Sequence, residues 1–364
     1  MPELVKESHV SRIVLEGFKS IAECDLELGK LNVLIGCNGA GKSNFISLWS
    51  MIQQLLNQNL QIFVSRQGGP DALLHFGRKT TEQLEFKFYF GNKGYFAKLE
   101  PTLDNRLMFA SEAFWSDEDG ELQIGRGHFE TNTSQAVVTG INTYVLESMQ
   151  QWRVYHFHDT SNTAYVKQPH SINDNAYLRP DARNLAAFLY FLQIAHPKSY
   201  QQIVKTIRLV APFFGDFYLR PSPHNNDVIE LQWFEVGQDT PFKAHLLSDG
   251  TLRFICLATV LLQPQSFQPE TILVDEPELG LHPYAITALA SLIRAATSEK
   301  QVIISTQSVE LLNQFDANQV IVVDREEGKS SLRRLQLPDL SQWLEEYSLG
   351  ELWKKNILGG RPSR

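Results

Sequence analysis

The stretch GCNGAGKS, from Gly36 to Ser43, matches in full the pattern GxxxxGK(S/T), in which a glycine-rich turn holds a phosphate. The glycines of such a loop let successive backbone N–H groups converge on an anion. Lys42 then reaches the outer phosphates, and the hydroxyl of Ser43 is offered to magnesium. The residues that we expect to contact the nucleotide are Gly36, Asn38, Gly39, Ala40, Gly41, Lys42, Ser43 and Asn44.

The residues on either side of this loop predict a strand before it and a helix after it. The apolar run from Leu31 to Ile35 is typical of a buried strand. After the loop, apolar residues recur at helical spacing, at Phe45, Leu48, Trp49, Ile52, Leu55 and Leu56. Strand, loop and helix in this order are the context that a phosphate loop requires.

A second stretch, ILVDEPE from Ile272 to Glu278, predicts an apolar strand that ends in two carboxylates. Asp275 can hold the magnesium shell, and Glu276 can polarise an attacking water. A strand that ends in a solvated acidic turn has the same pattern. The phosphate loop in the same chain favours the metal and base roles.

A third stretch, HLLSDGTLRF from His245 to Phe254, places a polar turn before an apolar run. Ser248 stands at the N-cap of the predicted helix, with Thr251 close behind it. Taken alone, this is the pattern of a capped core helix. A helix N-terminus preceded by Ser and Gly is also a ready site for an anion.

The rest of the chain divides into regions of different patterning. From Leu84 to about Thr139 it is rich in aromatics and glycine, which suggests an antiparallel meander, and the segment from Ala182 to Val210 is helical twice. The last third alternates strand and helix, which predicts a parallel sheet covered by helices. We therefore expect four parts: an N-terminal core part (1–83), an insertion (84–240), a C-terminal core part (241–336) and a docked extension (337–364).

Composition limits the classes of partner. The 364 residues include 33 basic and 41 acidic side chains, so any contact with DNA must come from a local patch. The basic residues between Arg325 and Arg334 are interpreted as a solvated face, given the acidic neighbours Glu326 and Glu327. Three distant cysteines, a charged N-terminal stretch and the lack of an apolar run near ~20 residues predict a soluble protein of the reducing cytoplasm, without a membrane segment.

The segment HFHD, from His156 to Asp159, invites a metal interpretation. In a strand the two histidines share one face, but the aspartate points the other way, so the metal site is incomplete. We interpret this segment as structural packing.

Five stretches in this order and spacing resemble the ABC-type ATPase heads of the RecF, SMC and OLD-like families: GCNGAGKS, SRQGG, LLSDGT, ILVDEPELGLHP and IISTQS. EGFKS near the N-terminus and SLGELWKKNILGG near the C-terminus resemble the compact, stand-alone ATPases of bacteria in particular. The resemblance implies an α/β P-loop NTPase fold of the ABC-ATPase-like head type. It combines a mostly parallel core sheet, an N-terminal antiparallel β-region, an inserted β-meander and a small helical lobe, without a coiled coil.

The resemblance also implies roles for residues outside the phosphate loop. Ser248, Asp249 and Gly250 would contact the γ-phosphate held by a second subunit, so a homodimer or higher oligomer with sandwiched ATP is expected. Asp249 stands where the family most often has glycine. Gln67 in SRQGG would be a further magnesium-linked residue, and Gln307 would join Glu276 in catalysis, at a position where many relatives carry histidine.

Taken together, these features predict a cytoplasmic ATPase that uses ATP and Mg²⁺ and acts on DNA, or controls a DNA-directed effector, in DNA repair or antiviral defence. Double-stranded DNA is a candidate partner. Because the OLD-like relatives carry a C-terminal nuclease and this chain stops at Arg364, we expect any nuclease to be a separate polypeptide. The alternative is a slowly hydrolysing sensor or scaffold. A transporter motor is disfavoured by the lack of a membrane segment, and a GTPase by the lack of an NKxD motif.

Overall fold

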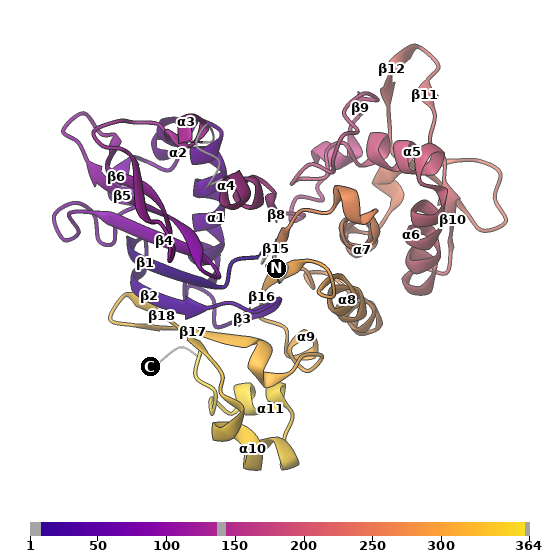
Figure 1. Ribbon diagram of the computed structural model, residues 1–364. Coiled ribbons are helices and arrows are strands. Elements are labelled where there is room, and N and C mark those ends of the chain that lie inside the picture. The colour runs from indigo at the N-terminus through magenta and orange to yellow at the C-terminus, as the bar shows by residue number, and fades with distance from the viewer. Residues whose placement is uncertain (1–8, 137–142, 361–364) are drawn as a thin grey trace, which may run out of the picture. The chain divides into compact units, whose positions relative to one another are not determined.

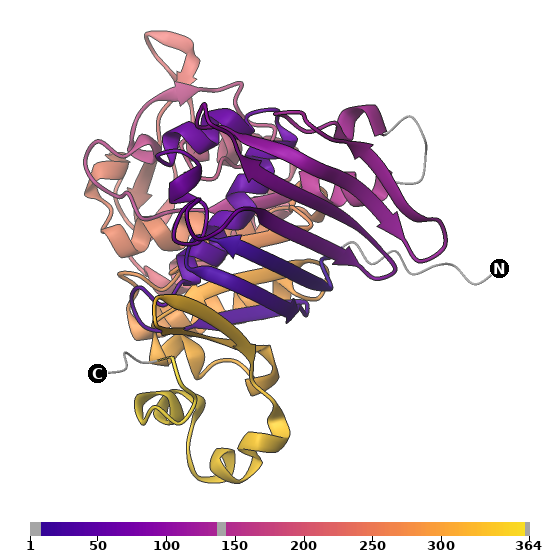
Figure 2. The same cartoon turned by 90° about the vertical axis from the view of Figure 1, so that its left-hand side faces the viewer.

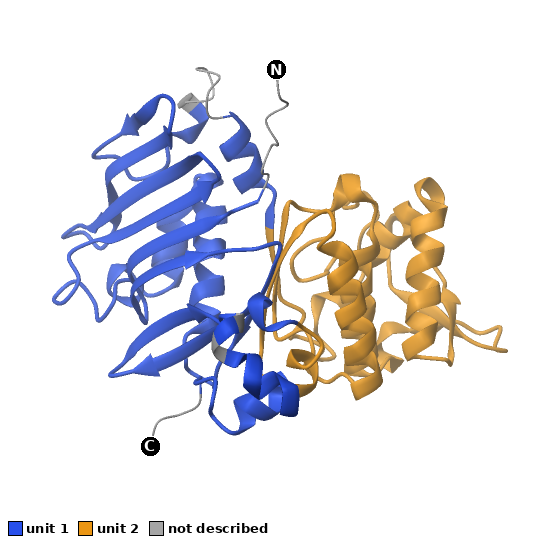
Figure 3. Ribbon diagram, turned by 60° about the horizontal axis from the view of Figure 1, so that its bottom comes forward, with its two compact units in different colours: residues 1–152, 316–364 blue, residues 153–315 orange. Residues whose placement is uncertain are grey.

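The computed structural model describes residues 9–136 and 143–360. The first eight residues, residues 137–142 at the end of the predicted meander, and the last four residues of the predicted extension lie outside the described residues. The chain forms two compact units, shown in Figure 3: unit 1 comprises residues 1–152 and 316–364, and unit 2 comprises residues 153–315. Each is described by itself, and the four-part division expected from the sequence stays a prediction.

Unit 1 contains a six-stranded antiparallel sheet, visible in Figure 2, with the order β2-β1-β4-β5-β6-β7. Buried and less buried residues alternate along β4, which is the pattern of a sheet with one face on a core. The two strands around EGFKS therefore share a sheet with the predicted meander. The strands are β1 (Arg12–Phe18), β2 (Ile21–Glu27), β4 (Leu84–Phe90), β5 (Lys93–Pro101), β6 (Leu107–Ser116) and β7 (Gly120–Gly125).

Three further strands of unit 1 lie next to the phosphate loop in the chain or in space. β3 (Leu31–Ile35) is buried throughout and pairs in parallel with β17 (Val320–Glu326), which pairs in turn with the antiparallel β18 (Lys329–Arg334). The α-helices among the described residues of unit 1 are α1 (Lys42–Leu56), α2 (Leu60–Arg66), α3 (Thr133–Ala136), α4 (Thr143–Gln150), α10 (Leu337–Glu346) and α11 (Leu349–Lys354) (Figure 1).

Helix α1 buries the apolar face that its sequence predicts. The ring of Trp49 meets Phe88 of β4 edge-on, with centroids 5.6 Å apart, and Trp152 at 4.4 Å. Because aromatic side chains bury large apolar areas, this cluster fixes the helix that follows the phosphate loop against the antiparallel sheet.

Unit 2 carries the strand and helix alternation expected of the last third. β15 (Thr271–Asp275) and β16 (Gln301–Thr306) are parallel and fully buried, and α8 (Pro283–Ala296) connects them. The remaining strands of unit 2 are β9 (His170–Ser171), β10 (Phe214–Phe217), β11 (Pro221–Ser222), β12 (Asn225–Ile229), β13 (Gln232–Glu235) and β14 (Phe242–Lys243), preceded by β8 (Trp152–Tyr155). The remaining helices are α5 (Leu185–Ala195), α6 (Pro197–Val210), α7 (Asp249–Leu262) and α9 (Val309–Leu312).

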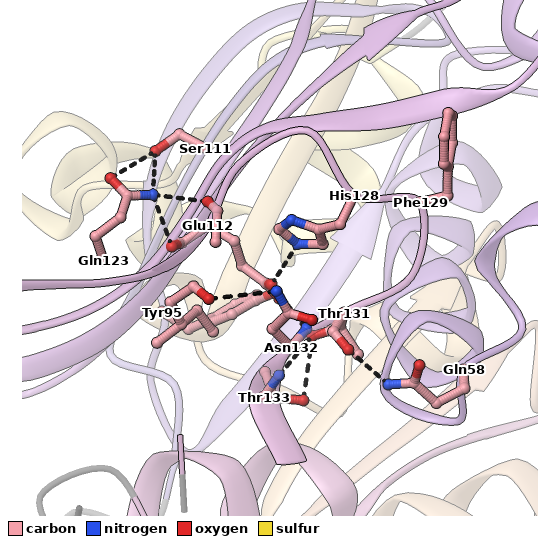
Figure 4. Close-up of polar contacts among 12 residues, drawn as sticks. Gln58, Tyr95, Ser111, Glu112, Gln123, His128, Phe129, Thr131, Asn132 and Thr133 are labelled. Carbon is pink, nitrogen blue, oxygen red and sulfur yellow. Dashed lines mark hydrogen bonds and ion pairs between the residues drawn. The ribbon is translucent and has the colours of Figure 1, made fainter. Parts of the chain in front are cut away.

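A buried carboxylate organises the edge of the antiparallel sheet, as Figure 4 shows. Glu112 of β6 is fully buried and accepts hydrogen bonds from the Tyr95 hydroxyl at 2.6 Å and the backbone N–H of Asn132 at 2.9 Å. The hydroxyl of Thr131 also donates to it, and His128 Nε2 lies 2.9 Å away. Burial is the main cause that raises the pKa of Tyr95 well above its ordinary value, and the nearby Glu112 raises it further. These contacts hold the segment 128–133, called the strap below.

The strap also fixes the start of α2. The carboxylate of Glu130 accepts hydrogen bonds from the backbone N–H groups of Leu60 at 2.8 Å and Gln61 at 3.0 Å. The Asn59 side chain at the N-cap accepts no capping hydrogen bond, so a carboxylate from the strap takes that role. Among the described residues, no helix is both long and apolar enough to cross a membrane.

Candidate functional site

The phosphate loop lies between β3 and α1 in unit 1, as the sequence predicts. A Cβ on Gly36 would stand 2.3 Å from the carbonyl oxygen of Val323, so β17 approaches too closely for any side chain. Gly41 has φ of 119°, a conformation that residues with a side chain rarely adopt. Both glycines are therefore required by the backbone itself.

Lys42 occupies the mouth of this loop. Its side chain is buried, and Nζ donates to the carbonyl oxygens of Gly36 at 2.7 Å and Cys37 at 3.1 Å. Neutral carbonyls hold the ammonium group at the place where a phosphate-binding lysine works. A phosphate arriving at the loop would offer it stronger, charge-assisted acceptors.

Residues distant in the sequence brace the loop. Ser330 Oγ donates to the carbonyl oxygen of Ala40 at 2.5 Å and is hydrogen-bonded to the Ser20 hydroxyl at 2.7 Å, and Asn44 Nδ2 donates to the same Ser20 oxygen at 2.6 Å. Arg325 donates to the carbonyl oxygen of Gly39 at 2.9 Å. The sequence predicts that Arg325 lies on a solvated face. Its side chain is exposed, and it also contacts the loop.

The C-terminal extension reaches the loop as well. The backbone N–H of Cys37 donates to the carbonyl oxygen of Gly360 at 2.7 Å, and the N–H of Gly360 donates to the carboxylate of Asp324 at 2.9 Å. Gly360 has φ of 78°. A Cβ on Gly360 would lie 3.4 Å from the Cα of Gly36. The sequence predicted a docked extension but not this contact.

Gln67 lies at the end of α2 in unit 1. It is exposed, and its Oε1 accepts a hydrogen bond from Lys19 Nζ at 3.3 Å. Burial lowers the pKa of Lys19 from its ordinary value. Gln67, Lys19, Asn44 and Arg325 line one open groove of about 680 Å³. The groove thus runs from the predicted magnesium-linked glutamine to the start of α1, and the role of Gln67 stays a prediction.

The predicted metal-binding and catalytic acids lie in unit 2, at the carboxyl ends of two parallel strands. Asp275 of β15 stands opposite Ser305 of β16, whose hydroxyl donates to the Asp275 carboxylate. The backbone N–H of Glu276 donates to the carbonyl oxygen of Ser305 at 2.9 Å. Glu276 has φ of 46°, which is uncommon for a residue with a side chain and occurs mainly where the surroundings fix the backbone.

The two predicted catalytic side chains contact each other. Gln307 Nε2 donates to Glu276 Oε1, and the backbone N–H of Gln307 donates to Glu278 Oε1 at 3.1 Å. Thr306 Oγ1 donates to the same Glu278 oxygen at 2.5 Å. Burial raises the pKa of Glu278 from its ordinary value, with a smaller contribution from Glu276. The sequence predicts no catalytic or metal-binding role for Glu278, although it is the third acid of DEPE.

The turn that opens α7 has the geometry that its sequence predicts. Ser248 is the N-cap, and its side chain accepts a hydrogen bond from the backbone N–H of Thr251 at 3.2 Å. Asp249 is 63% exposed, and Lys167 Nζ stands 3.9 Å from its carboxylate although the lysine side chain itself is buried. A cation therefore lies beside the carboxylate that departs from the family pattern.

The segment HFHD lies beside the acidic strand end. His158 Nε2 is 2.9 Å from the carbonyl oxygen of Asp275, and Asp275 also acts electrostatically on His156. Burial is the largest cause that lowers the pKa of His156, and Asp275 opposes it. Within residues 9–136 and 143–360, no group of three or more His, Cys, Asp or Glu side chains is arranged to hold a metal ion.

The predicted site residues thus fall into two groups. Unit 1 brings together the phosphate loop and Asn44, with Gln67 along the groove, and unit 2 holds Asp275, Glu276, Gln307 and the Ser248–Gly250 turn. The predicted magnesium ligands Ser43 and Asp275 belong to different units. Their oxygen donors are of the kind that Mg²⁺ prefers, and a magnesium ion bound with few protein ligands takes its other oxygens from phosphates and water.

The fold is that of the P-loop ATPase heads of the SMC type. Residues 31–313 match the model of the family described as "AAA domain, putative AbiEii toxin, Type IV TA system", and the chain belongs to that family. Among curated proteins no sequence matches the chain.

Two solved structures show the likeness of the fold. An Smc head bound to the C-winged helix domain of ScpA has a TM-score of 0.63 and 18% identity, over 92% of this chain and 99% of that chain. An Smc head with an extended coiled coil, bound to the C-terminal domain of ScpA from Pyrococcus furiosus, has a TM-score of 0.59 and 17% identity, over 93% and 99%. The expected α/β head fold is thereby confirmed.

Proposed function

We propose that this protein binds ATP with magnesium, hydrolyses it, and dimerises around two ATP molecules to act on DNA or to control a separate DNA-directed effector such as a nuclease. The observation that carries the hydrolytic part is the contact between Gln307 and Glu276. A carboxylate fixed by a neighbouring amide, on a backbone held at positive φ, is arranged as a general base is.

Each residue has a defined task in this proposal. The backbone N–H groups of the loop and Lys42 hold the phosphates, while Ser43 and Asp275 supply oxygen ligands to magnesium. Magnesium, when bound, neutralises charge on the phosphates. Glu276 accepts a proton from the attacking water, and Gln307 orients the carboxylate through its amide. Ser248 and Gly250 offer a helix N-terminus to the γ-phosphate held by a second copy.

The biological setting is proposed from the family. The family is described by a toxin of a Type IV toxin–antitoxin system, which favours a role in defence over one in repair. The Smc heads of similar fold are described as bound to ScpA domains, which supports a separate protein partner here. We also propose a cytoplasmic location, because the three cysteines are far apart in the sequence and show no disulfide framework.

The second candidate is a sensor or scaffold that holds ATP with very slow turnover. The exposed carboxylate of Asp249 favours it, because a negative charge beside a phosphate weakens the clamp between two copies. Turnover by the pure protein separates the two candidates.

The experiment measures ATP turnover and the mass of the oligomer, with and without double-stranded DNA and with magnesium or a chelator. The variants are Lys42→Ala, Glu276→Gln and, as a matched exposed acid of unit 2, Glu299→Gln. We expect Glu276→Gln to abolish turnover while ATP traps a dimer, because binding contacts remain and only water activation is lost. Lys42→Ala should lose both, and Glu299→Gln neither.

The outcomes distinguish the proposals. Stimulation of the wild type by DNA supports the DNA-acting ATPase. A trapped dimer that is indifferent to DNA, with turnover near background, supports the sensor or scaffold. No dimer with ATP in any variant contradicts the role of the Ser248–Gly250 turn.

A further inference from the structure

Arg253 joins the helix that follows the Ser248–Gly250 turn to two other segments of unit 2. It lies in the first turns of α7, whose N-cap is Ser248. Its Nη1 donates to the carbonyl oxygen of Leu279 at 2.9 Å, in the loop after β15. Its Nε donates to the carbonyl oxygen of Phe157 at 3.0 Å, and Nη2 donates to that of His158 at 2.8 Å. One side chain therefore ties three segments together.

Both of these segments contact the acidic strand end. Leu279 follows Glu276, and its N–H donates to the Glu276 carbonyl oxygen at 3.2 Å. His158 contacts the neighbouring acid, with Nε2 2.9 Å from the carbonyl oxygen of Asp275. Arg253 is thus linked to each of the two acids through one intervening residue, Leu279 for Glu276 and His158 for Asp275.

Two glycines allow this close fit. A Cβ on Gly250 would lie 2.3 Å from the carbonyl oxygen of Gly280, so the start of α7 rests directly on the loop after β15. Gly280 has φ of 76°, and a Cβ there would lie 2.8 Å from Arg253 Nη1. The guanidinium fits only because Gly280 has no side chain. The helix contacts the loop only because Gly250 has none.

We infer that Arg253 is a positioning residue that transmits the position of the Ser248–Gly250 turn to Asp275 and Glu276. This inference rests on the proposed ATPase function. When a phosphate draws the N-terminus of α7 toward it, the guanidinium carries Leu279 and His158 with the helix, and the backbone around both acids follows. Only a planar fork with several N–H groups can serve acceptors on two segments at once, which a lysine ammonium does not do with the same geometry.

The test compares Arg253→Gln and Arg253→Lys with a matched control, Arg294→Gln, in the whole protein. Arg294, in the last turn of α8, also belongs to unit 2 and donates to a backbone carbonyl oxygen, that of Gln314. The measurements are kcat and KM for ATP, the Kd of a fluorescent ATP analogue, and the thermal unfolding midpoint. We expect both Arg253 variants to lower kcat by about tenfold or more, with KM and Kd within about threefold of wild type, and Arg294→Gln to change neither.

Two further readouts separate positioning from general folding. Millimolar guanidinium, far below denaturing concentrations, should restore part of kcat in Arg253→Gly but not in Arg294→Gly, because it refills the vacated site. In a double-mutant cycle of Arg253→Gln with Ser248→Ala, kcat of the double variant should be no lower than that of the slower single variant, because both substitutions interrupt the same path.

The outcomes are distinct from those of the proposed function. If Lys42→Ala and Glu276→Gln abolish turnover but Arg253→Gln matches Arg294→Gln, the inference about Arg253 is wrong and the ATPase proposal stands. If Arg253→Gln lowers both kcat and the thermal unfolding midpoint, and guanidinium does not rescue kcat in Arg253→Gly, Arg253 is only a structural contact and the inference is overturned. Background turnover in the wild type contradicts the ATPase proposal itself.

Discussion

The side-chain amide of Gln307, at the end of β16, donates a hydrogen bond to the carboxylate of Glu276, which follows the parallel strand β15. An amide orients this carboxylate without titrating in the neutral range. Turnover should therefore show no ionisation near neutral pH that comes from residue 307.

Replacing this amide with an imidazole should add such an ionisation. In Gln307→His, the neutral ring orients Glu276, whereas the cationic ring pairs with the carboxylate and weakens it as a base. We expect ATP turnover of the variant to fall as the pH drops through about 6 to 7, near the ordinary histidine pKa of about 6.5, while wild type stays level. Initial rates between pH 5.5 and 8.5 measure this. Superimposable pH profiles would count against a contact between residue 307 and the base.

The buried carboxyl of Glu278 should make stability depend on pH in a defined direction. Its folded-state pKa is raised above the ordinary value of 4.5, chiefly by burial. An acid whose pKa rises on folding favours the folded state below 4.5, and this contribution is lost as the pH rises through the folded-state pKa. Relative to Glu278→Gln, which does not titrate, wild type should therefore lose free energy of unfolding as the pH rises from 4.5 toward neutrality.

Urea unfolding of both proteins across that range measures the difference. Glu278→Ala, which leaves the Thr306 hydroxyl and the Gln307 N–H without this acceptor, should cost about 1–3 kcal/mol at neutral pH. The exposed Glu299→Ala should cost about 0.5 kcal/mol or less. A wild-type advantage that grows with pH would contradict the burial of Glu278.

Lys167 should offset the charge of Asp249 in the turn before α7. With the two groups 3.9 Å apart, Lys167→Gln removes a cation beside an exposed carboxylate. If the turn meets a phosphate, the ATP-dependent dimer of Lys167→Gln should weaken by roughly threefold to tenfold, as expected for about 1 kcal/mol of charge interaction. In an Asp249→Asn background the same substitution should have much less effect. Sedimentation of Glu276→Gln carrying these changes gives the dissociation constants, and equal weakening in both backgrounds would exclude the pairing.

The strap should contribute to stability through α2. Glu130→Ala removes the acceptor for two backbone N–H groups at the start of that helix, so we expect a loss of about 1–2 kcal/mol in free energy of unfolding. The exposed Glu121→Ala, on β7 of the same sheet, serves as the control and should change it by less than about 0.5 kcal/mol. An unchanged unfolding midpoint in Glu130→Ala would show that Asn59 or water caps the helix instead.

The parts of the site that the sequence predicts are those whose chemistry is local. Gly36 and Gly41 follow from the spacing of one loop, and Ser248 is recognisable as an N-cap from the few residues around it. The contacts that brace these residues are not local: Ser330 meets Ala40 across 290 positions, and Gln307 meets Glu278 across 29. Such pairs leave no periodic pattern in a single sequence.

A second group of contacts cannot be predicted from the sequence because the acceptors are backbone carbonyl oxygens. Arg253 and His158 contact carbonyl oxygens, which every residue carries, so neither contact marks its partner by residue type. The composition of HFHD predicts packing, because its side chains form an incomplete metal site. Its position beside Asp275 follows from the fold and not from its composition.

Because the backbone N–H of Cys37 donates to a residue near the C-terminus, Gly360, the phosphate loop can reach its final structure only late in the synthesis of the chain. β3 pairs with β17, and the loop that follows β3 is closed by a residue made more than three hundred positions later. A nascent chain can form α1 early, because its contacts with Phe88 and Trp152 lie in the first half of the sequence. The braced loop must wait for the distal strands, since long-range pairing comes late in folding. Ribosome-bound or prematurely terminated chains would then lack the finished loop, so nucleotide binding would be acquired only after elongation has passed Gly360.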